Sequence, residues 1–340
     1  MKINGQTTLK RTGLNLGLAV ALGSLASFAA AESVMKIAHV VPAGDPRDIA
    51  ANYVADYMNS SAMCEMEAEV FPSAQLGGTT DLIEGMQIGS IESVVLPASF
   101  LVGFQPMMGL FDFPFFWPSD LDTLLEVHNS ESMKELLATT ESQGIYSKAV
   151  WHTGYKQWTA NSELRDPDDY RGIRARVMPS DILITQQESL GMTPVDMPFP
   201  ETYNALQSGA ISAQENPIPT TFVMGFHEVQ DYMIMTNHGN LDQIFMVSKA
   251  WFDGLSDACQ TELDKAIDDG KQVVVDETKD LESRGMQAIR AQGTTIVELS
   301  DAEVTALRDA TLPAVRARFI EITGNEGEAM LELIESELEL

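Results

Sequence analysis

Short β-type runs alternate with amphipathic stretches through the first 250 residues of the chain. The β-type runs include residues 35–41, 67–71 and 93–96, and the helical stretches include residues 46–59 and 80–88. This alternation is typical of βαβ units, in which a mostly parallel sheet is covered by helices. The pattern then resumes, with strands expected at 146–151, 173–177 and 243–248 and helices at 181–190 and 201–208. We therefore expect an α/β protein with two lobes, each a mixed sheet flanked by helices.

Helical patterns dominate from Trp251 onward, apart from an interruption at residues 293–297. Ser300 followed by Glu303 has the spacing of a capping box that begins the last long helix. Gly324 and Gly327 are expected to interrupt that helix before a final helical segment. No Gly/Ser-rich or Pro-rich linker divides the chain, so we expect it to cross between the lobes more than once. The predicted bounds are 32–153 plus about 242–281 for lobe I, 154–241 plus about 282–310 for lobe II, and 311–340 for C-terminal helices that brace both.

The first 31 residues have the pattern of a secretory signal. Lys2, Lys10 and Arg11 precede an apolar run at residues 14–25, and small residues at 29–31 provide a cleavage site. A membrane anchor is the alternative, but the apolar run is shorter than the ~20 residues that a helical span needs. We predict cleavage after Ala31, a periplasmic location in a Gram-negative bacterium, and no direct membrane insertion.

The chain is strongly acidic. Its 21 Lys and Arg against 50 Asp and Glu give a net charge of −29, and removal of the three basic residues of the signal changes the balance to 18 minus 50, or −32. A field of this sign repels nucleic acids and anionic membranes, so neither is expected as a partner. An anionic ligand would need a local cationic pocket that works against the overall charge.

The chain has two cysteines, Cys64 and Cys259. In an oxidising compartment an even pair favours a disulfide. Two separate buried thiols remain the alternative, since the sequence does not show that positions so far apart are close in space.

Signatures of catalysis and of cofactor binding are missing from the sequence. It has no G-x-S-x-G elbow, no phosphate-binding P-loop and no G-x-G-x-x-G after a strand. His227 and Glu228 begin like a zinc-protease motif, but Asp231 stands where the second histidine is needed. We therefore expect no enzyme activity, no metal and no cofactor. A periplasmic enzyme that uses scattered carboxylates on a similar scaffold remains the alternative.

Residues 153–248 are the most specific part of the sequence. Lys156 stands alone among the aromatic residues of the run GYKQW at 154–158. Arg174 and Arg176 are two apart in a predicted strand, so their side chains share one face. Two such arginines on a half-buried strand need an anion or a carboxylate partner. Further along the chain, Asn216 lies just before a proline that restricts the local backbone.

The same segment contains five further runs in a fixed order: GIRARVMPS at 172–180, LGMTPVDMPF at 190–199, YNALQSG at 203–209, QENP at 214–217 and TNHG at 236–239. In their sequence and order these runs resemble the solute-binding proteins of tripartite ATP-independent periplasmic (TRAP) transporters, DctP type. Further similarity at 71–78, 113–116 and 322–324 extends the resemblance over nearly the whole chain after the signal.

The resemblance implies a two-lobed periplasmic-binding-protein fold that closes by hinge motion around a carboxylate-containing solute and delivers it to the TRAP membrane permease subunits. It also implies roles for three residues. Arg176 would form a two-pronged salt bridge with the solute carboxylate, Asn216 would donate a side-chain hydrogen bond to it, and Phe199 would form a wall of the pocket. A guanidinium fork beside an amide suits this chemistry.

The sequence departs from the family at Lys156, where many relatives carry a second ligand-contacting arginine. A lysine is a point charge on a flexible stem and cannot form a bidentate fork. We predict that Lys156 contacts a carboxylate oxygen or a hydroxyl of the solute, with a solvent-facing lysine as the alternative. The ligand class stays open among monocarboxylates, dicarboxylates, sugar acids, aromatic acids and zwitterions such as ectoine. A role in chemosensing is the alternative to transport.

His39, Phe115 and Trp158 are weaker candidates for the ligand pocket. Ends of strands in open α/β sheets face the ligand crevice, and His39 ends the first predicted strand. For the aromatic residues, packing in the core is the competing interpretation.

Overall fold

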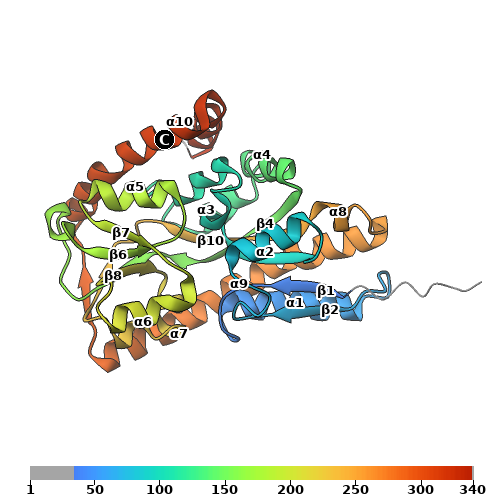
Figure 1. The fold of residues 1–340 in the computed structure, drawn as a ribbon, viewed down its shortest axis with the longest axis horizontal. Helices are drawn as coiled ribbons and strands as arrows, with labels where there is room; N and C mark the ends of the chain where they lie inside the picture. Colours follow the sequence, from blue (N-terminus) through green and yellow to red (C-terminus); the bar gives the residue numbers. More distant parts are fainter. Residues whose placement is uncertain (1–33, 339–340) are drawn as a thin grey trace, which may run out of the picture. The chain divides into compact units, whose positions relative to one another are not determined.

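The computed structural model describes residues 34–338 of the chain (Figure 1). The predicted signal, residues 1–31, lies outside this range. The described strands form two sheets, and helices flank both of them. The expected α/β architecture, with two lobes built on mixed sheets and long helices near the C-terminus, is confirmed.

The five-stranded sheet has the order β2-β1-β3-β10-β4. Strand β1 pairs in parallel with β2 and β3, whereas β10 is antiparallel to both β3 and β4. The sheet is therefore mixed, as predicted. Its strands are β1 (Met35–Ala38), β2 (Ala68–Phe71), β3 (Ser93–Pro97), β4 (Ile145–Tyr155) and β10 (Asn240–Ser248).

The six-stranded sheet has the order β11-β9-β5-β8-β6-β7. Strand β6 is parallel to β7 and β8, while β5 is antiparallel to β8 and β9. The chain passes from the first sheet to the second between β4 and β5 and returns between β9 and β10. The strands are β5 (Gln157–Ala160), β6 (Arg174–Val177), β7 (Thr193–Asp196), β8 (Ala213–Asn216), β9 (Tyr232–Met235) and β11 (Thr295–Glu298).

Shorter helices cover the sheets, as Figure 1 shows. On the side of the first sheet these are α1 (Pro46–Ser60), α2 (Thr79–Gln87), α3 (Leu121–His128), α4 (Glu131–Ala138) and α8 (Lys249–Phe252), with the 3-10 helices η1 (Ala98–Leu101) and η2 (Pro106–Asp112). On the side of the second sheet they are α5 (Asp181–Ser189), α6 (Thr202–Gln207) and α7 (Ile218–Val223), with the 3-10 helix η5 (Phe199–Glu201).

Helix α9 (Asp257–Gln292) packs along β4 and then against α7. The Trp151 indole Nε1 donates to the carbonyl of Ile267 at 3.1 Å. A Cβ at Gly270 would lie 2.7 Å from the Trp151 ring, so a glycine is needed for this close approach. Helix α9 therefore contacts β4 of the first sheet and α7, which lies on the side of the second sheet.

Helix α10 (Asp301–Glu337) contacts η2 and α4 on one side and α5 on the other. It begins with the predicted capping box, in which Ser300 and Glu303 bond reciprocally. Gly324 interrupts it with non-helical angles, φ 64° and ψ −151°, whereas Gly327 is helical. The predicted interruption of the last helix is therefore confirmed. Of the two glycines proposed for it, Gly324 interrupts the helix and Gly327 does not. The exact bounds proposed for the lobes stay a prediction.

Cys64 and Cys259 form a disulfide between the segment after α1 and the first turn of α9. The bonded residues are 195 positions apart, so the bridge closes a long loop of the unfolded chain. Replacing both cysteines with serine should lower the free energy of unfolding by about 2–5 kcal/mol, because the unfolded chain gains conformational freedom. Urea unfolding of the oxidised proteins measures this difference. An unchanged free energy would show that the bridge does not stabilise the fold.

Candidate solute-binding site

A small buried cavity lies between the two sheets, at the ends of their parallel strands. Five of its lining residues come from the side of the first sheet, and four come from the second: Val40, Arg47, Pro97, Phe100 and Leu241, then Arg176, Met178, Phe199 and Asn216. The carboxyl ends of parallel strands are where open α/β sheets bind ligands. Three of the predicted ligand residues, Arg176, Phe199 and Asn216, therefore line one cavity.

Arg176 lies in β6 and is only 2% exposed. Its Nε and Nη2 atoms are buried and have no hydrogen-bond partner among the described residues. Burial lowers the pKa of Arg176 to about 10, against the opposing effects of the Glu215 and Asp196 charges, so the group stays charged at neutral pH. By contrast, Arg174 is exposed at the start of the same strand. Unpaired buried donors are costly, and a carboxylate is the group that satisfies them best.

Asn216 ends β8, which runs parallel to β6. It is 3% exposed, and its Nδ2 donates to Gln214 Oε1 at 2.5 Å. The following Pro217 packs closely on Gly154, where a Cβ would lie 3.0 Å from the proline Cβ. Because φ of Gly154 is also +111°, that position favours glycine on two grounds. This packing positions the end of β8 at the cavity.

Phe199 forms one wall of the cavity from η5. Its ring centre lies 5.5 Å from Arg176 Cζ. A ring at this distance covers the guanidinium and is within range of a cation–π interaction.

Arg47 lines the cavity from the opposite side and is not among the residues predicted from the sequence. It lies in the first turn of α1, where its Nε donates to Asp45 Oδ1 at 3.0 Å and its Nη1 donates to Gln243 Oε1 at 3.1 Å. A signal was available, since Asp45 followed by Pro46 is typical of a helix start just after a strand. The cavity therefore has one guanidinium from α1, on the side of the first sheet, and one from β6 of the second sheet.

Lys156 lies between β4 and β5 and is 1% exposed. Its Nζ donates to Glu215 Oε1 at 3.2 Å, and it is not among the residues that line the cavity. A Cβ at Gly239 would lie 2.9 Å from Lys156 Cε, so a larger residue there would displace the lysine side chain. The solvent-facing alternative is wrong, because the side chain is buried. A direct contact between Lys156 and the solute stays a prediction.

The carboxylate of Glu215 accepts two further hydrogen bonds. His238 Nε2 lies 2.6 Å and Gln186 Nε2 lies 3.0 Å from Glu215 Oε2. Burial alone would raise the pKa of Glu215, but the charge of Lys156 and the hydrogen bond from His238 outweigh it and hold the pKa well below its ordinary value. Glu215 is therefore a buried anion that accepts three hydrogen bonds.

The three weaker candidates do not line the cavity with Arg176. Trp158 stacks on His238 with ring centres 5.3 Å apart, and Phe115 lies 6.2 Å from the same imidazole. His39 is fully buried, and its Nε2 lies 3.1 Å from Asp48 Oδ1. Trp158 and Phe115 line a separate small cavity with Gln186. Their role as pocket walls stays a prediction.

Asp242 in β10 is a second buried anion. His152 Nδ1 lies 2.8 Å from Asp242 Oδ1, and His128 Nε2 lies 3.1 Å from Asp242 Oδ2. Burial again acts to raise the pKa of the carboxyl, and the two histidines together hold the pKa below its ordinary value.

Acidification should destabilise the fold through Glu215 and Asp242. Their ordinary pKa values are 4.5 and 3.8, and both are lowered in the folded protein. The unfolded chain therefore binds protons first, so the stabilisation is complete above about pH 5 and decreases as the pH falls through the unfolded-state values. We expect these two groups to lower the free energy of unfolding, measured with urea, by about 2 kcal/mol between pH 7 and pH 3.5. A flat profile would contradict this assignment.

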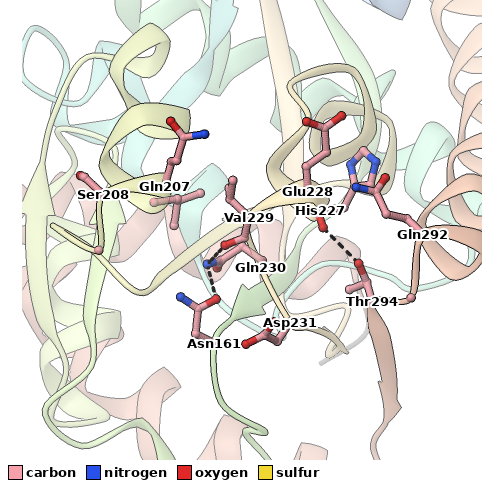
Figure 2. A pocket seen from close by; sticks show the side chains of 13 residues that line it. Asn161, Gln207, Ser208, His227, Glu228, Val229, Gln230, Asp231, Gln292 and Thr294 are labelled. Atoms are coloured by element: carbon pink, nitrogen blue, oxygen red, sulfur yellow. Dashed lines mark hydrogen bonds between the residues drawn. The ribbon is translucent and has the colours of Figure 1, made fainter.

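A larger, open depression lies elsewhere on the second sheet's side (Figure 2). Its acidic residues are Glu228 and Asp231, and its 13 lining residues include no lysine or arginine. Its Gln230 is already bonded to Asn161 at 2.8 Å. None of the predicted ligand residues lies there, and its charge would repel a carboxylate. The smaller cavity that contains Arg176 is therefore the better candidate for an anionic solute.

The model of bacterial extracellular solute-binding protein family 7 matches residues 37–322. The chain belongs to this family. The C4-dicarboxylate-binding periplasmic protein DctP of Rhodobacter capsulatus is 30% identical over 315 residues, 92% of each chain. The ectoine-binding periplasmic protein TeaA of Halomonas elongata is 27% identical over 92% of each chain. The resemblance inferred from the sequence motifs is thus confirmed for this family 7 member.

Solved structures agree with the family assignment. A TRAP periplasmic solute-binding protein from Desulfovibrio salexigens, with bound orotic acid, has a TM-score of 0.87 and 30% identity, over 89% of this chain and 98% of the other. One from Shewanella oneidensis, with bound succinate, has a TM-score of 0.84 and 28% identity, over 90% and 99%. The two-lobed fold of this family 7 member is therefore shared with transporter-associated binding proteins.

Proposed function

We propose that this protein captures a small organic solute that bears a carboxylate, holds it between its two lobes and catalyses no reaction on it. The observation that carries the proposal is Arg176, a buried guanidinium with two unpartnered donor atoms in a cavity beside Asn216. A planar fork matches two carboxylate oxygens, and the amide of Asn216 supplies a further donor. Phe199 excludes water from the pair.

Binding requires movement of the lobes or of the lining side chains. The cavity is only about 10 Å³, near the minimum that one water molecule needs. Its walls come from both sheets, so a solute contacts both lobes only when they are closed around it. Contacts that exist only in the closed state shift the population toward that state.

Delivery to a TRAP membrane permease is the proposed consequence of capture. Family membership and the periplasmic relatives support a periplasmic location. The signal pattern of residues 1–31 is the proposed route of export, with cleavage after Ala31. Within residues 34–338, no helix combines the length and the apolar character that a membrane span requires. Chemosensing through a membrane receptor would use the same capture step with a different partner.

A thermal-shift screen of organic acids tests the proposal. A carboxylate that binds only the folded protein should raise the melting temperature progressively with its concentration. Recovery of the best ligand unchanged after long incubation distinguishes a binding protein from an enzyme. If no carboxylate raises the melting temperature while neutral solutes do, the assigned chemistry is wrong.

A further inference from the structure

We infer that the solute carries a single net negative charge, and that Asp45 sets this limit by neutralising Arg47. The inference rests on the proposed function and concerns the cavity around Arg176. Three buried cations lie at or beside this cavity: Arg47, Lys156 and Arg176.

Two of these cations already have buried carboxylate partners. Arg47 Nε lies 3.0 Å from Asp45 Oδ1, with side chains 3% and 2% exposed. Lys156 Nζ lies 3.2 Å from Glu215 Oε1, with side chains 1% and 3% exposed. Each pair is neutral overall, and His238 and Gln186 also donate hydrogen bonds to Glu215.

Arg176 differs from both. Within residues 34–338 it forms no ion pair, and two of its donor atoms are unpartnered. Three other acids are near, but none forms an ion pair with Arg176: Asp48 lies 3.1 Å from His39 Nε2, Asp112 accepts from the Ser99 hydroxyl at 2.6 Å, and Asp196 is exposed to solvent. The cavity therefore has one uncompensated positive charge, which a single carboxylate neutralises.

A second carboxylate in the same closed cavity would be a buried charge without a counter-charge. Burial of an uncompensated charge costs far more than a hydrogen bond to it returns. Arg47 still lines the cavity and can donate to a neutral acceptor on the solute. The arrangement therefore favours monocarboxylates with a hydroxyl, carbonyl or amide group at the far end, such as hydroxy acids and sugar acids.

Asp45→Asn tests the role of Asp45 without removing the helix cap. Asp45 is the N-cap of α1 and accepts from the Arg47 backbone N–H at 3.0 Å, and asparagine caps a helix as well as aspartate does. The variant leaves Arg47 uncompensated. Asp120→Asn is the matched control, because Asp120 caps α3 in the same way but is exposed.

The experiment is isothermal titration calorimetry at pH 7.5 with two series of probes that differ in charge on one skeleton. One series is succinamide, succinamate and succinate, and the other is galactose, galacturonate and galactarate. In the unmodified protein, the singly charged member of the skeleton that binds should bind at least about tenfold more tightly than the doubly charged member. Asp45→Asn should shift that ratio by at least about tenfold toward the doubly charged member, and Asp120→Asn should leave it unchanged.

The outcomes separate the two proposals. Equal or tighter binding of the doubly charged member by the unmodified protein would overturn the charge limit and leave the proposed function intact. An unchanged ratio in Asp45→Asn would overturn the role of Asp45. If only the uncharged members bind, the proposed function falls and the inference falls with it.

Discussion

Replacing Arg176 with alanine is expected to weaken binding of the carboxylate solute by about 2–5 kcal/mol, roughly 30-fold to several thousand-fold in Kd. The reason is that Arg176 is the cation of this cavity without an acidic partner among the described residues, and the substitution would leave the solute carboxylate buried without a counter-charge. Titration calorimetry measures the change. Arg176→Lys should recover only part of the affinity, because an ammonium cannot reproduce the bidentate fork.

The same variant should not destabilise the protein in the absence of solute. Removing a buried cation with unpartnered donors relieves a desolvation cost instead of breaking a pair. Arg174→Ala is the matched control, because Arg174 lies two residues earlier in β6 and is exposed. Its affinity for the solute and its free energy of unfolding should both stay near those of the unmodified protein. Affinity unchanged in Arg176→Ala would contradict the assigned site.

Replacing Lys156 with methionine should lower the free energy of unfolding by about 3–5 kcal/mol. Methionine approximates the shape of the lysine stem but leaves the buried Glu215 carboxylate without its cationic partner 3.2 Å away. The double variant Lys156→Met with Glu215→Gln should cost less than the sum of the two single changes, because the pair is removed together. Urea unfolding at pH 7 measures all three variants.

An exposed pair provides the control for that comparison. Lys249 and Asp253 lie 2.8 Å apart on the surface, with side chains 36% and 50% exposed. Lys249→Met should therefore cost no more than about 1 kcal/mol. Strict additivity of Lys156→Met and Glu215→Gln would show that their ion pair does not stabilise the fold.

Local pattern was sufficient to predict much of the fold. The alternation of β-type runs and helices located β1, β2, β3 and α1, and the capping box at Ser300 located the start of α10. The short strands β5, β7, β8 and β9 were not predicted. Length is not the reason, since β1 and β2 also have four residues. The sequences of β7 (TPVD) and β8 (AQEN) contain few β-type residues, so pairing within the second sheet decides their structure more than their own sequence does.

The candidate site was predictable where it depends on local motifs and not where it depends on distant pairs. Arg176 and Asn216 both lie in family-like runs, and the structure brings them to one cavity. The pairing of Lys156 with Glu215 joins residues 59 positions apart, which no local pattern reveals. Arg47 could have been considered from the helix start at Asp45, but its bond to Gln243 spans 196 positions.

A crystal structure of the protein with a bound carboxylate solute tests the central claim most directly. We expect the carboxylate oxygens to lie about 2.7–2.9 Å from two nitrogen atoms of Arg176, with Asn216 as a further donor and the solute enclosed by residues of both sheets. A solute bound in the open depression of Figure 2, or bound beside Phe199 with its acid group directed away from the guanidinium, would contradict the account.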